Sequence, residues 1–318
     1  MLPAKRILIW LDPPFAALIR AIAPLLEAEI VGLGSSSDKT STELARQLEA
    51  PRFTDLRQAV LETDCDLLFL AIADEILPEV REAIISRNLP TALIQPPFDS
   101  INSAIELQEE SHLFKVIPAL RHSAGFRAAQ EILNHIGTPH AITISIRASP
   151  SQSTLFGRLF DAMDLITAVF SDVESLSAAL SAPRAASPET LSALHGSLSI
   201  NLRLHDGACA CALLTDSAGS WFRGATILGS NGCLRLTDTT VDWVDSTGRT
   251  IDPSHATSPL PAHEIYSEQI NRLLSDLDTT DSPTDFTKIL SICEAARLSA
   301  RTNQEEAPRK MLSLYRLP

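Results

Sequence analysis

The chain has 318 residues, 45% of them hydrophobic and 20% charged, and its 26 basic and 39 acidic side chains leave a net charge of −13. This composition is typical of globular proteins and excludes wholesale disorder, and the length predicts two domains. The acidic balance argues against binding of nucleic acid or an anionic membrane, because either surface needs basic side chains. No apolar run has the length of a membrane span and the first residues do not have a signal-peptide pattern, so we expect a cytoplasmic protein.

Apolar runs alternate with helical patterns over the first part of the chain. Strands are predicted at 6–11, 29–33, 67–72, 91–94 and 115–118, and helices at 15–27, 42–48, 56–62, 78–86 and 101–110. Strands that are apolar along their whole length are typical of a parallel sheet buried on both faces. With right-handed crossovers, the pattern predicts a doubly wound, Rossmann-like α/β domain over residues 1–121.

The second part of the chain, residues 122–318, has a different pattern. Helices are predicted at 126–135, 162–170, 264–277 and 285–301, the last with Asp285 as its N-cap, and a strand is predicted at 141–147. Residues 181–190 have the composition of a loop. Turn residues between alternating runs predict three hairpins, at 197–214, 226–236 and 240–251. This pattern predicts an α+β domain with a large, mostly antiparallel sheet and helices on one side.

The five cysteines are odd in number and scattered, so they predict no disulfide framework. Cys209 and Cys211 stand two apart in a predicted strand, and we interpret them as buried, small hydrophobic side chains. A zinc site would need further cysteines or histidines at ligand spacing, and none is found there.

A series of landmarks then follows in a characteristic order. They are the strand Asp66–Ile72, the segment Ile94–Pro97, Arg121 before a helix that ends at Gly137, Asp164–Leu165, the hairpin Leu228–Leu234 and the helical segment Glu294–Arg297. Together they resemble the Gfo/Idh/MocA family of glucose–fructose oxidoreductase, inositol dehydrogenase and rhizopine catabolism over nearly the whole chain. The resemblance implies an NAD(P)-dependent dehydrogenase of a sugar or polyol, with a small-molecule ligand in the cleft between the domains.

The first departure from that family is in the turn after the first strand. A dinucleotide site needs glycines there, so that backbone N–H groups approach the pyrophosphate at a helix N-terminus. The turn here reads Leu11-Asp12-Pro13-Pro14-Phe15-Ala16, and only Ala16 matches. The prolines lack N–H donors and Asp12 adds negative charge. The sequence therefore opposes ordinary dinucleotide binding, and the alternative interpretation is a rigid turn that starts a helix.

The end of the second strand reads Gly34-Ser35-Ser36-Ser37-Asp38-Lys39. An acidic residue that would bind the ribose hydroxyls of NAD is replaced there by hydroxyls and a lysine. Ser35, Ser36 and Lys39 would receive a 2′-phosphate, which favours NADP over NAD if either binds. The alternative interpretation is a polar loop that caps the helix predicted from Thr42.

The resemblance also implies a Glu-Lys-Pro motif and a histidine that acts as acid and base. Gln95 and Pro96 replace the acid and the lysine, Ala73 replaces a proline, and Asp161 stands at the histidine position, three residues before Asp164. A carboxylate acts as a base only when its pKa is shifted toward the working pH, and two carboxylates on one helix face favour such a shift. The alternative is an acidic pair at a helix N-terminus, stabilised by the helix dipole. The positions that correspond to cofactor contacts are Asp12, Pro13, Ser35, Ser36, Lys39, Ala73, Gln95 and Arg121, and the candidate catalytic pair is Asp161 and Asp164.

Three functions remain open on this evidence. The first is an oxidoreductase-like protein that has lost ordinary catalysis and acts as a binding module or partner. The second is an active NADP-dependent dehydrogenase with a rebuilt site, and the third is an enzyme of another class, such as a lyase or hydrolase, in the same cleft. The resemblance further implies a homo-oligomer through the open sheet, since an exposed apolar sheet face needs a cover.

Overall fold

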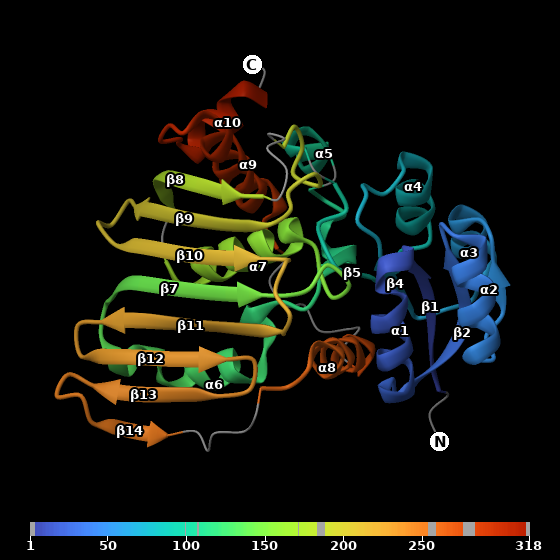
Figure 1. The fold of residues 1–318 in the computed structure, drawn as a ribbon, viewed down its shortest axis with the longest axis horizontal. Coiled ribbons are helices and arrows are strands. Elements are labelled where there is room, and N and C mark those ends of the chain that lie inside the picture. The colour runs from blue at the N-terminus through green and yellow to red at the C-terminus, as the bar shows by residue number, and fades with distance from the viewer. Residues whose placement is uncertain are drawn as a thin grey trace.

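The computed structural model describes residues 4–98, 100–106, 108–170, 172–182, 188–253, 259–275 and 284–315. It contains two sheets, which lie side by side with helices between and around them (Figure 1). No helix among these residues is both long and apolar enough to cross a membrane.

The first sheet has six parallel strands in the order β3-β2-β1-β4-β5-β6. The strands are β1 (Lys5–Leu11), β2 (Ala28–Ser35), β3 (Arg52–Phe53), β4 (Leu67–Ala71), β5 (Thr91–Leu93) and β6 (Phe114–Val116). The helices that connect them are α1 (Ala16–Ile22), α2 (Asp38–Gln47), α3 (Leu56–Glu62), α4 (Pro78–Ser86) and α5 (Ile101–Glu106). The predicted doubly wound sheet is confirmed. The helix predicted at 15–27 is shorter, because Pro24 lies in a 3₁₀ turn that ends it.

The second sheet has eight strands in the order β14-β13-β12-β11-β7-β10-β9-β8, antiparallel except between β7 and β10. The strands are β7 (Pro139–Arg147), β8 (Val173–Ser181), β9 (Ser197–Leu204), β10 (Cys209–Thr215), β11 (Phe222–Gly229), β12 (Gly232–Thr237), β13 (Val241–Asp245) and β14 (Thr250–Pro253). The three predicted hairpins are confirmed. Strand β8 was not predicted, and part of the loop predicted at 181–190, residues 183–187, lies outside the described residues.

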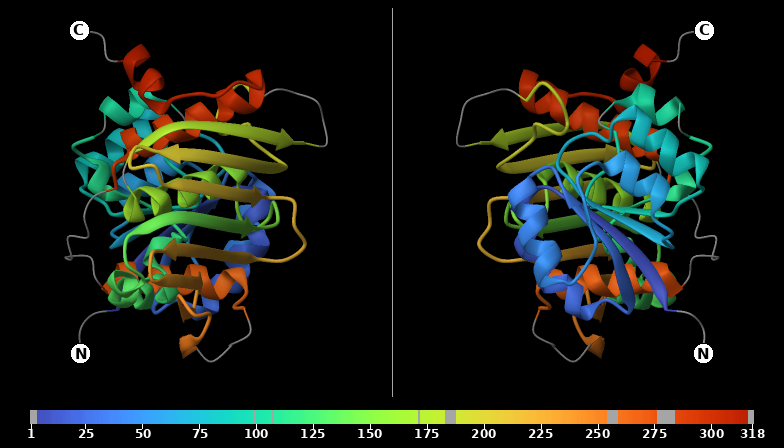
Figure 2. Two further views of the ribbon diagram at one scale, coloured as in Figure 1. Left: turned by 90° about the vertical axis from the view of Figure 1, so that its left-hand side faces the viewer. Right: turned by 90° about the vertical axis from the view of Figure 1, so that its right-hand side faces the viewer.

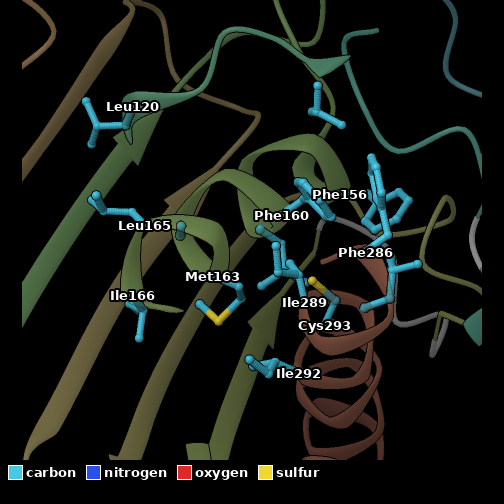
Figure 3. Close-up of a cluster of buried hydrophobic side chains, with 14 of the residues drawn as sticks. Leu120, Phe156, Phe160, Met163, Leu165, Ile166, Phe286, Ile289, Ile292 and Cys293 are labelled. Atoms are coloured by element: carbon cyan, nitrogen blue, oxygen red, sulfur yellow. The ribbon is translucent and has the colours of Figure 1, made fainter. Parts of the chain in front are cut away.

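Helix α7 (Leu155–Val169) lies at the centre of the molecule and is buried on every side over residues 155–166. Helix α9 (Phe286–Thr302) packs along it through a hydrophobic cluster that includes Phe160, Met163 and Phe286 (Figure 3). The remaining helices are α6 (Ala124–Ile132), α8 (Ala262–Ser275) and α10 (Pro308–Tyr315). The predicted N-cap of α9 is confirmed, since the carboxylate of Asp285 accepts the N–H of Lys288 at 2.9 Å.

The start predicted for this central helix, residue 162, is wrong. Helix α7 begins at Leu155, and the hydroxyl of Thr154 accepts the N–H of Gly157 at 3.0 Å as its N-cap. Asp161 therefore lies in the middle of the helix, away from the positive end of the helix dipole. The interpretation of Asp161 and Asp164 as an acidic pair at a helix N-terminus does not hold, because the dipole acts mainly over the first turn.

The second sheet has one covered and one open face. Helices α6, α7 and α9 contact the face that looks toward the first domain, and no helix in the described part of the chain packs on the other face (Figures 1 and 2). Most side chains on the open face are either small or polar, among them Thr143, Ser145, Ser177, Ser199, Asn201 and Thr226. A groove of about 290 Å³ crosses β7, β11, β12 and β13 on this face.

The prediction that Cys209 and Cys211 are buried is wrong. Along β10, Ala210, Ala212 and Leu214 are buried, whereas Cys209, Cys211 and Leu213 are exposed. The predicted alternation of two faces along the strand is confirmed, but the face that packs on the core is the one with Ala210, Ala212 and Leu214.

Candidate functional site

The carboxyl edge of the parallel sheet is where a doubly wound fold binds its ligand. Asp12 follows β1 at this edge, and its carboxylate joins three loops. Its Oδ1 accepts the hydroxyl of Ser36 at 2.8 Å, and its Oδ2 accepts the backbone N–H of Ala73 at 2.8 Å. The side chain thus ties the turn after β1 to the turns after β2 and β4. We call Asp12, Ser36 and Ala73 the Asp12 clasp.

The clasp does not fit a pyrophosphate bound in the ordinary way. In that mode, backbone N–H groups of the turn after β1 point at the phosphates. Pro13 and Pro14 lie there, both exposed, in a 3₁₀ turn before α1, and neither has an N–H. The Asp12 carboxylate adds a negative charge and already accepts the N–H of Ala73 and the hydroxyl of Ser36. A phosphate would meet repulsion and few free donors.

The segment after β2 combines local structure with exposed polar groups. Ser35 is buried, and its hydroxyl accepts the N–H of Ser37 at 3.2 Å. The hydroxyl of Ser37 accepts the N–H of Thr40, so α2 begins at Asp38, earlier than the predicted start at Thr42. Lys39 is exposed in the first turn of α2. The expected capping loop is therefore present, and Lys39 is still available to an anion.

Gln95 joins the first sheet to α7. Its side chain is buried, its Nε2 donates to the carbonyl of Ala73 at 2.6 Å, and its Oε1 accepts the hydroxyl of Thr154 at 2.8 Å. Helix and sheet are very close here, since a Cβ at Gly157 would lie 2.4 Å from the carbonyl oxygen of Ile94. Both polar ends of Gln95 are thus used inside the protein, at the position where the family resemblance implies an acid.

Asp161 lies between two arginines and is 2% exposed. Its Oδ1 accepts the N–H of Leu120 at 2.6 Å, and its Oδ2 accepts Nη1 of Arg158 at 3.0 Å and Nη1 of Arg223 at 2.8 Å. A general base needs a lone pair directed at a substrate proton. Both oxygens of Asp161 instead accept buried hydrogen bonds from the chain itself.

The pairing continues beyond Asp161. Nε of Arg223 donates to Oδ1 of Asp238 at 2.9 Å, and the indole N–H of Trp221 donates to Oδ2 of Asp238 at 3.1 Å. Two buried arginines therefore face two buried carboxylates, so the formal charges balance. Burial lowers the pKa of Arg223, but Asp238 and Asp161 outweigh it and hold this pKa above its usual value. We call Arg158, Asp161, Arg223 and Asp238 the buried charge network.

Asp164 has its own partner. Its Oδ2 lies 3.0 Å from Nε of Arg121, and its Oδ1 is buried without a hydrogen bond among the described residues. Burial raises the pKa of Asp164 to about 7, although Arg121 acts in the opposite direction. Arg121 also donates to the hydroxyl of Thr284 at 3.3 Å, so its guanidinium links α7 to the residues just before α9. The two candidate carboxylates thus do not converge on one open site, and a catalytic role for either stays a prediction.

Helix α8 fixes the first domain against the second. Gln269 both donates to and accepts from the backbone of Ala119, at 3.0 and 2.9 Å. Asn271 contacts the segment after α1 in the same way: its amide donates to the carbonyl of Leu25 and accepts the N–H of Glu27, both at 2.9 Å. Hydrogen bonds from side chains to backbone, made in pairs, resist movement of one domain against the other.

Sequence reasoning missed several residues of this region. Arg158 stands three positions before Asp161 on α7, and this i,i+3 spacing could have indicated the pair. Arg223 and Asp238 come from separate strands, and no local pattern links them to Asp161. Among the described residues, no group of three or more potential metal ligands is present.

Comparison with known proteins places the fold. No protein-family model and no curated protein sequence matches the chain. Solved structures do match it. An oxidoreductase from Agrobacterium radiobacter, solved with NAD⁺, L-tartaric acid and magnesium, has a TM-score of 0.72 at 16% identity and covers 97% of this chain and 99% of its own. The myo-inositol 2-dehydrogenase of Lactobacillus plantarum has a TM-score of 0.72 at 15% identity, and the match covers 96% of this chain and 99% of the dehydrogenase.

A third structure carries a bound sugar nucleotide. The WlbA dehydrogenase of Bordetella pertussis, solved with NADH and UDP-GlcNAcA, has a TM-score of 0.66 at 15% identity and covers 96% of this chain and 99% of its own. Each of the three likenesses extends over nearly the whole of both chains. At these identities, the likeness establishes the fold.

Proposed function

We propose that this chain, which has the two-domain fold of the Gfo/Idh/MocA oxidoreductases, is a relative without nicotinamide-dependent dehydrogenase activity that acts by binding. Its ligands in this proposal are a small molecule held between the domains and a second copy of the chain. The proposal concerns the site and not the fold, because one fold hosts many functions.

The Asp12 clasp is the observation that carries the proposal. A carboxylate of the chain accepts from Ala73 and Ser36 at the edge where a dinucleotide fold receives phosphate. Losing the clasp would cost two hydrogen bonds to a charged group, each contributing about 1.5–3 kcal/mol. A pyrophosphate would have to displace these bonds and remain near the negative charge of Asp12.

The neighbouring residues support the same proposal. Asp161 stands where the family resemblance implies a histidine that acts as acid and base, and Gln95 stands where it implies an acid. Both side chains are buried and hydrogen-bonded within the chain. Neither side chain presents a proton or a lone pair to a bound substrate in this arrangement. We therefore expect a substitution of Gln95 or Asp161 to lower the stability of the fold and not to remove a catalytic group.

Calorimetric titration of the full chain with NADH and NADPH tests the proposal. We expect no binding of either cofactor at millimolar concentration. The variants Lys39→Ala and Lys310→Ala form a matched pair, since both lysines are exposed and Lys310 lies far along the chain on α10. Micromolar NADPH binding that is weakened by Lys39→Ala and unchanged by Lys310→Ala would overturn the proposal. It would support an active NADP-dependent dehydrogenase instead.

That alternative has one observation in its favour. Lys39 is exposed at the start of α2, three residues after the exposed Ser36, so a cation and a hydroxyl lie at the end of β2 where a 2′-phosphate would bind. The alternative requires a pyrophosphate pocket that includes Asp12 and two prolines, so we rank it second.

A further inference from the structure

The segment that connects the two sheets is residues 117–122, which we call the linker. It follows β6 of the first sheet and precedes α6, which packs on the second sheet. The carbonyl of Pro118 in the linker accepts Nη1 of Arg158 at 3.2 Å and Nη1 of Arg223 at 2.5 Å. Both arginines belong to the buried charge network, so the backbone of the linker is anchored to α7 and β11.

Two backbone N–H groups of the linker are also held by side chains of the second domain. The N–H of Ala119 donates to Oε1 of Gln269 on α8 at 2.9 Å, and the N–H of Leu120 donates to Oδ1 of Asp161 on α7 at 2.6 Å. Each N–H loses its partner when the linker leaves its place. Hydrogen exchange at these two positions therefore measures undocking of the linker.

Asp164 is a further anchor of the linker on α7, one turn after Asp161. Its Oδ2 lies 3.0 Å from Nε of Arg121, whereas its Oδ1 is buried and has no hydrogen-bond donor among the described residues. A buried oxygen without a donor costs more free energy when it carries charge than when the carboxyl is neutral. The geometry therefore disfavours the ionised carboxylate as long as the linker is docked.

The charged neighbours of Asp164 do not remove this cost. Burial raises its pKa to about 7, although Arg121 in the linker and Lys115 on β6 act in the opposite direction, and Asp161 adds to the rise. Nε of Arg121 also donates to Nε2 of His122 at 3.2 Å, so His122 is a second titratable group beside this contact.

The other elements that pack along α7 direct apolar side chains at it. They are β7 and β10, whose covered faces include Ile142, Ile144, Ala210 and Ala212, and α9 with Ile289 and Cys293. The charged Lys288 and Arg297 of α9 pair elsewhere, with Asp172 and Glu294. Among the described residues, the charges that act on Asp164 are therefore those of Arg121, Lys115 and Asp161.

We propose that Asp164 is a pH-dependent latch between the two domains: the linker stays docked on α7 while this carboxyl is protonated, and it undocks more readily once the carboxyl is ionised. Ionisation releases the proton to solvent, and undocking lets water hydrate the carboxylate. The linker and α7 lie on the covered side of the second sheet, away from the open face. The inference concerns the joint between the domains and does not depend on the proposed function.

Proton linkage sets the size of the effect. The carboxyl titrates near pH 7 in the docked state and near its usual 3.8 when water surrounds it. Because the docked state holds the proton more tightly, undocking becomes about tenfold more favourable with each pH unit between these values and stops changing above pH 7. From pH 5 to pH 8, we expect the equilibrium constant for undocking to rise roughly 100-fold.

Hydrogen exchange of the full chain, followed by NMR at pH 5, 6, 7 and 8, tests the latch. Dividing each rate by the intrinsic rate at that pH gives the opening constants of Ala119 and Leu120. The unmodified chain should show the rise, and Asp164→Asn, which stays neutral, should keep the constant of pH 5 throughout. Asp172→Asn, at an exposed carboxylate, and His122→Gln are the controls, and both should retain the rise.

The N–H of Ile9 separates undocking from global unfolding, since Ile9 is fully buried on the central strand β1 of the first sheet. A latch requires that Leu120 opens more readily than Ile9 at every pH. Equal opening constants at all four pH values would overturn it, because Asp164 would then act on global stability alone. An unmodified chain without the rise, or a rise that persists in Asp164→Asn, would overturn it as well.

Discussion

At the scale of single residues, Asp164 has the most informative environment. Its carboxylate is 4% exposed, and burial raises its pKa to about 7, well above the usual 3.8, while Arg121 and Lys115 act in the opposite direction and Asp161 in the same one. Between about pH 4 and pH 7, the folded chain therefore holds a proton at Asp164 that the unfolded chain has lost. More protons bound to the folded state mean that this group's contribution to stability falls as the pH rises through that window.

The variant Asp164→Asn stays neutral at every pH and tests this contribution. Relative to the unmodified chain, we expect its free energy of unfolding to rise between pH 5 and pH 8, by at most about 3 kcal/mol, because about two pKa units of the shift lie above pH 5. Urea unfolding at pH 5, 6.5 and 8 measures the difference. Asp172→Asn is the control, since Asp172 is exposed and Lys288 lowers its pKa, which predicts a flat difference over this range. A flat difference for Asp164→Asn would contradict the expectation.

At the scale of secondary-structure elements, local patterns predicted most of the strands and failed at the most buried helix. The hairpins of the second sheet were predictable because turn residues separate alternating runs. Helix α7 is buried on every side over residues 155–166, so it lacks the amphipathic periodicity that indicates where a helix begins. Of the buried charge network, only the pair of Arg158 and Asp161 on α7 was within reach of a local pattern. Arg223 and Asp238 join this pair only after β11 and the end of β12 have packed against α7.

The position of Asp161 in α7 predicts a large effect on stability. Removing one partner of a buried ion pair leaves the other charge uncompensated, which typically costs 3–5 kcal/mol. We therefore expect Asp161→Asn to lower the free energy of unfolding by about 3–5 kcal/mol, because Arg158 and Arg223 both lose a charged acceptor. Denaturant unfolding at pH 7 measures the loss. Asp206→Asn, in an exposed hairpin turn, is the matched control and should change stability by less than about 1 kcal/mol. A loss for Asp161→Asn no larger than that of the control would show that the network is not structural.

At the scale of the whole molecule, the second sheet has an open face on which no helix of the described residues packs (Figures 1 and 2). The homo-oligomer expected from the sequence rested on an apolar face, but most side chains of this face are either small or polar. Its larger apolar side chains include Leu213 and Leu228, which are 54% and 39% exposed. Small polar side chains still permit close approach of two sheets, which pack about 10 Å apart, so we retain a second copy as the proposed cover.

Light scattering at micromolar concentration tests this assembly. We expect the unmodified chain to be oligomeric, and Leu213→Asp, on the open face, to shift it toward monomer, because a buried unpaired charge is strongly unfavourable at an interface. Leu77→Asp is the matched control, since Leu77 is 60% exposed and precedes α4 in the first domain. An interface through the open sheet requires that only the first variant dissociates. A monodisperse monomer for the unmodified chain would exclude the assembly, and the binding role would then rest on the small-molecule ligand alone.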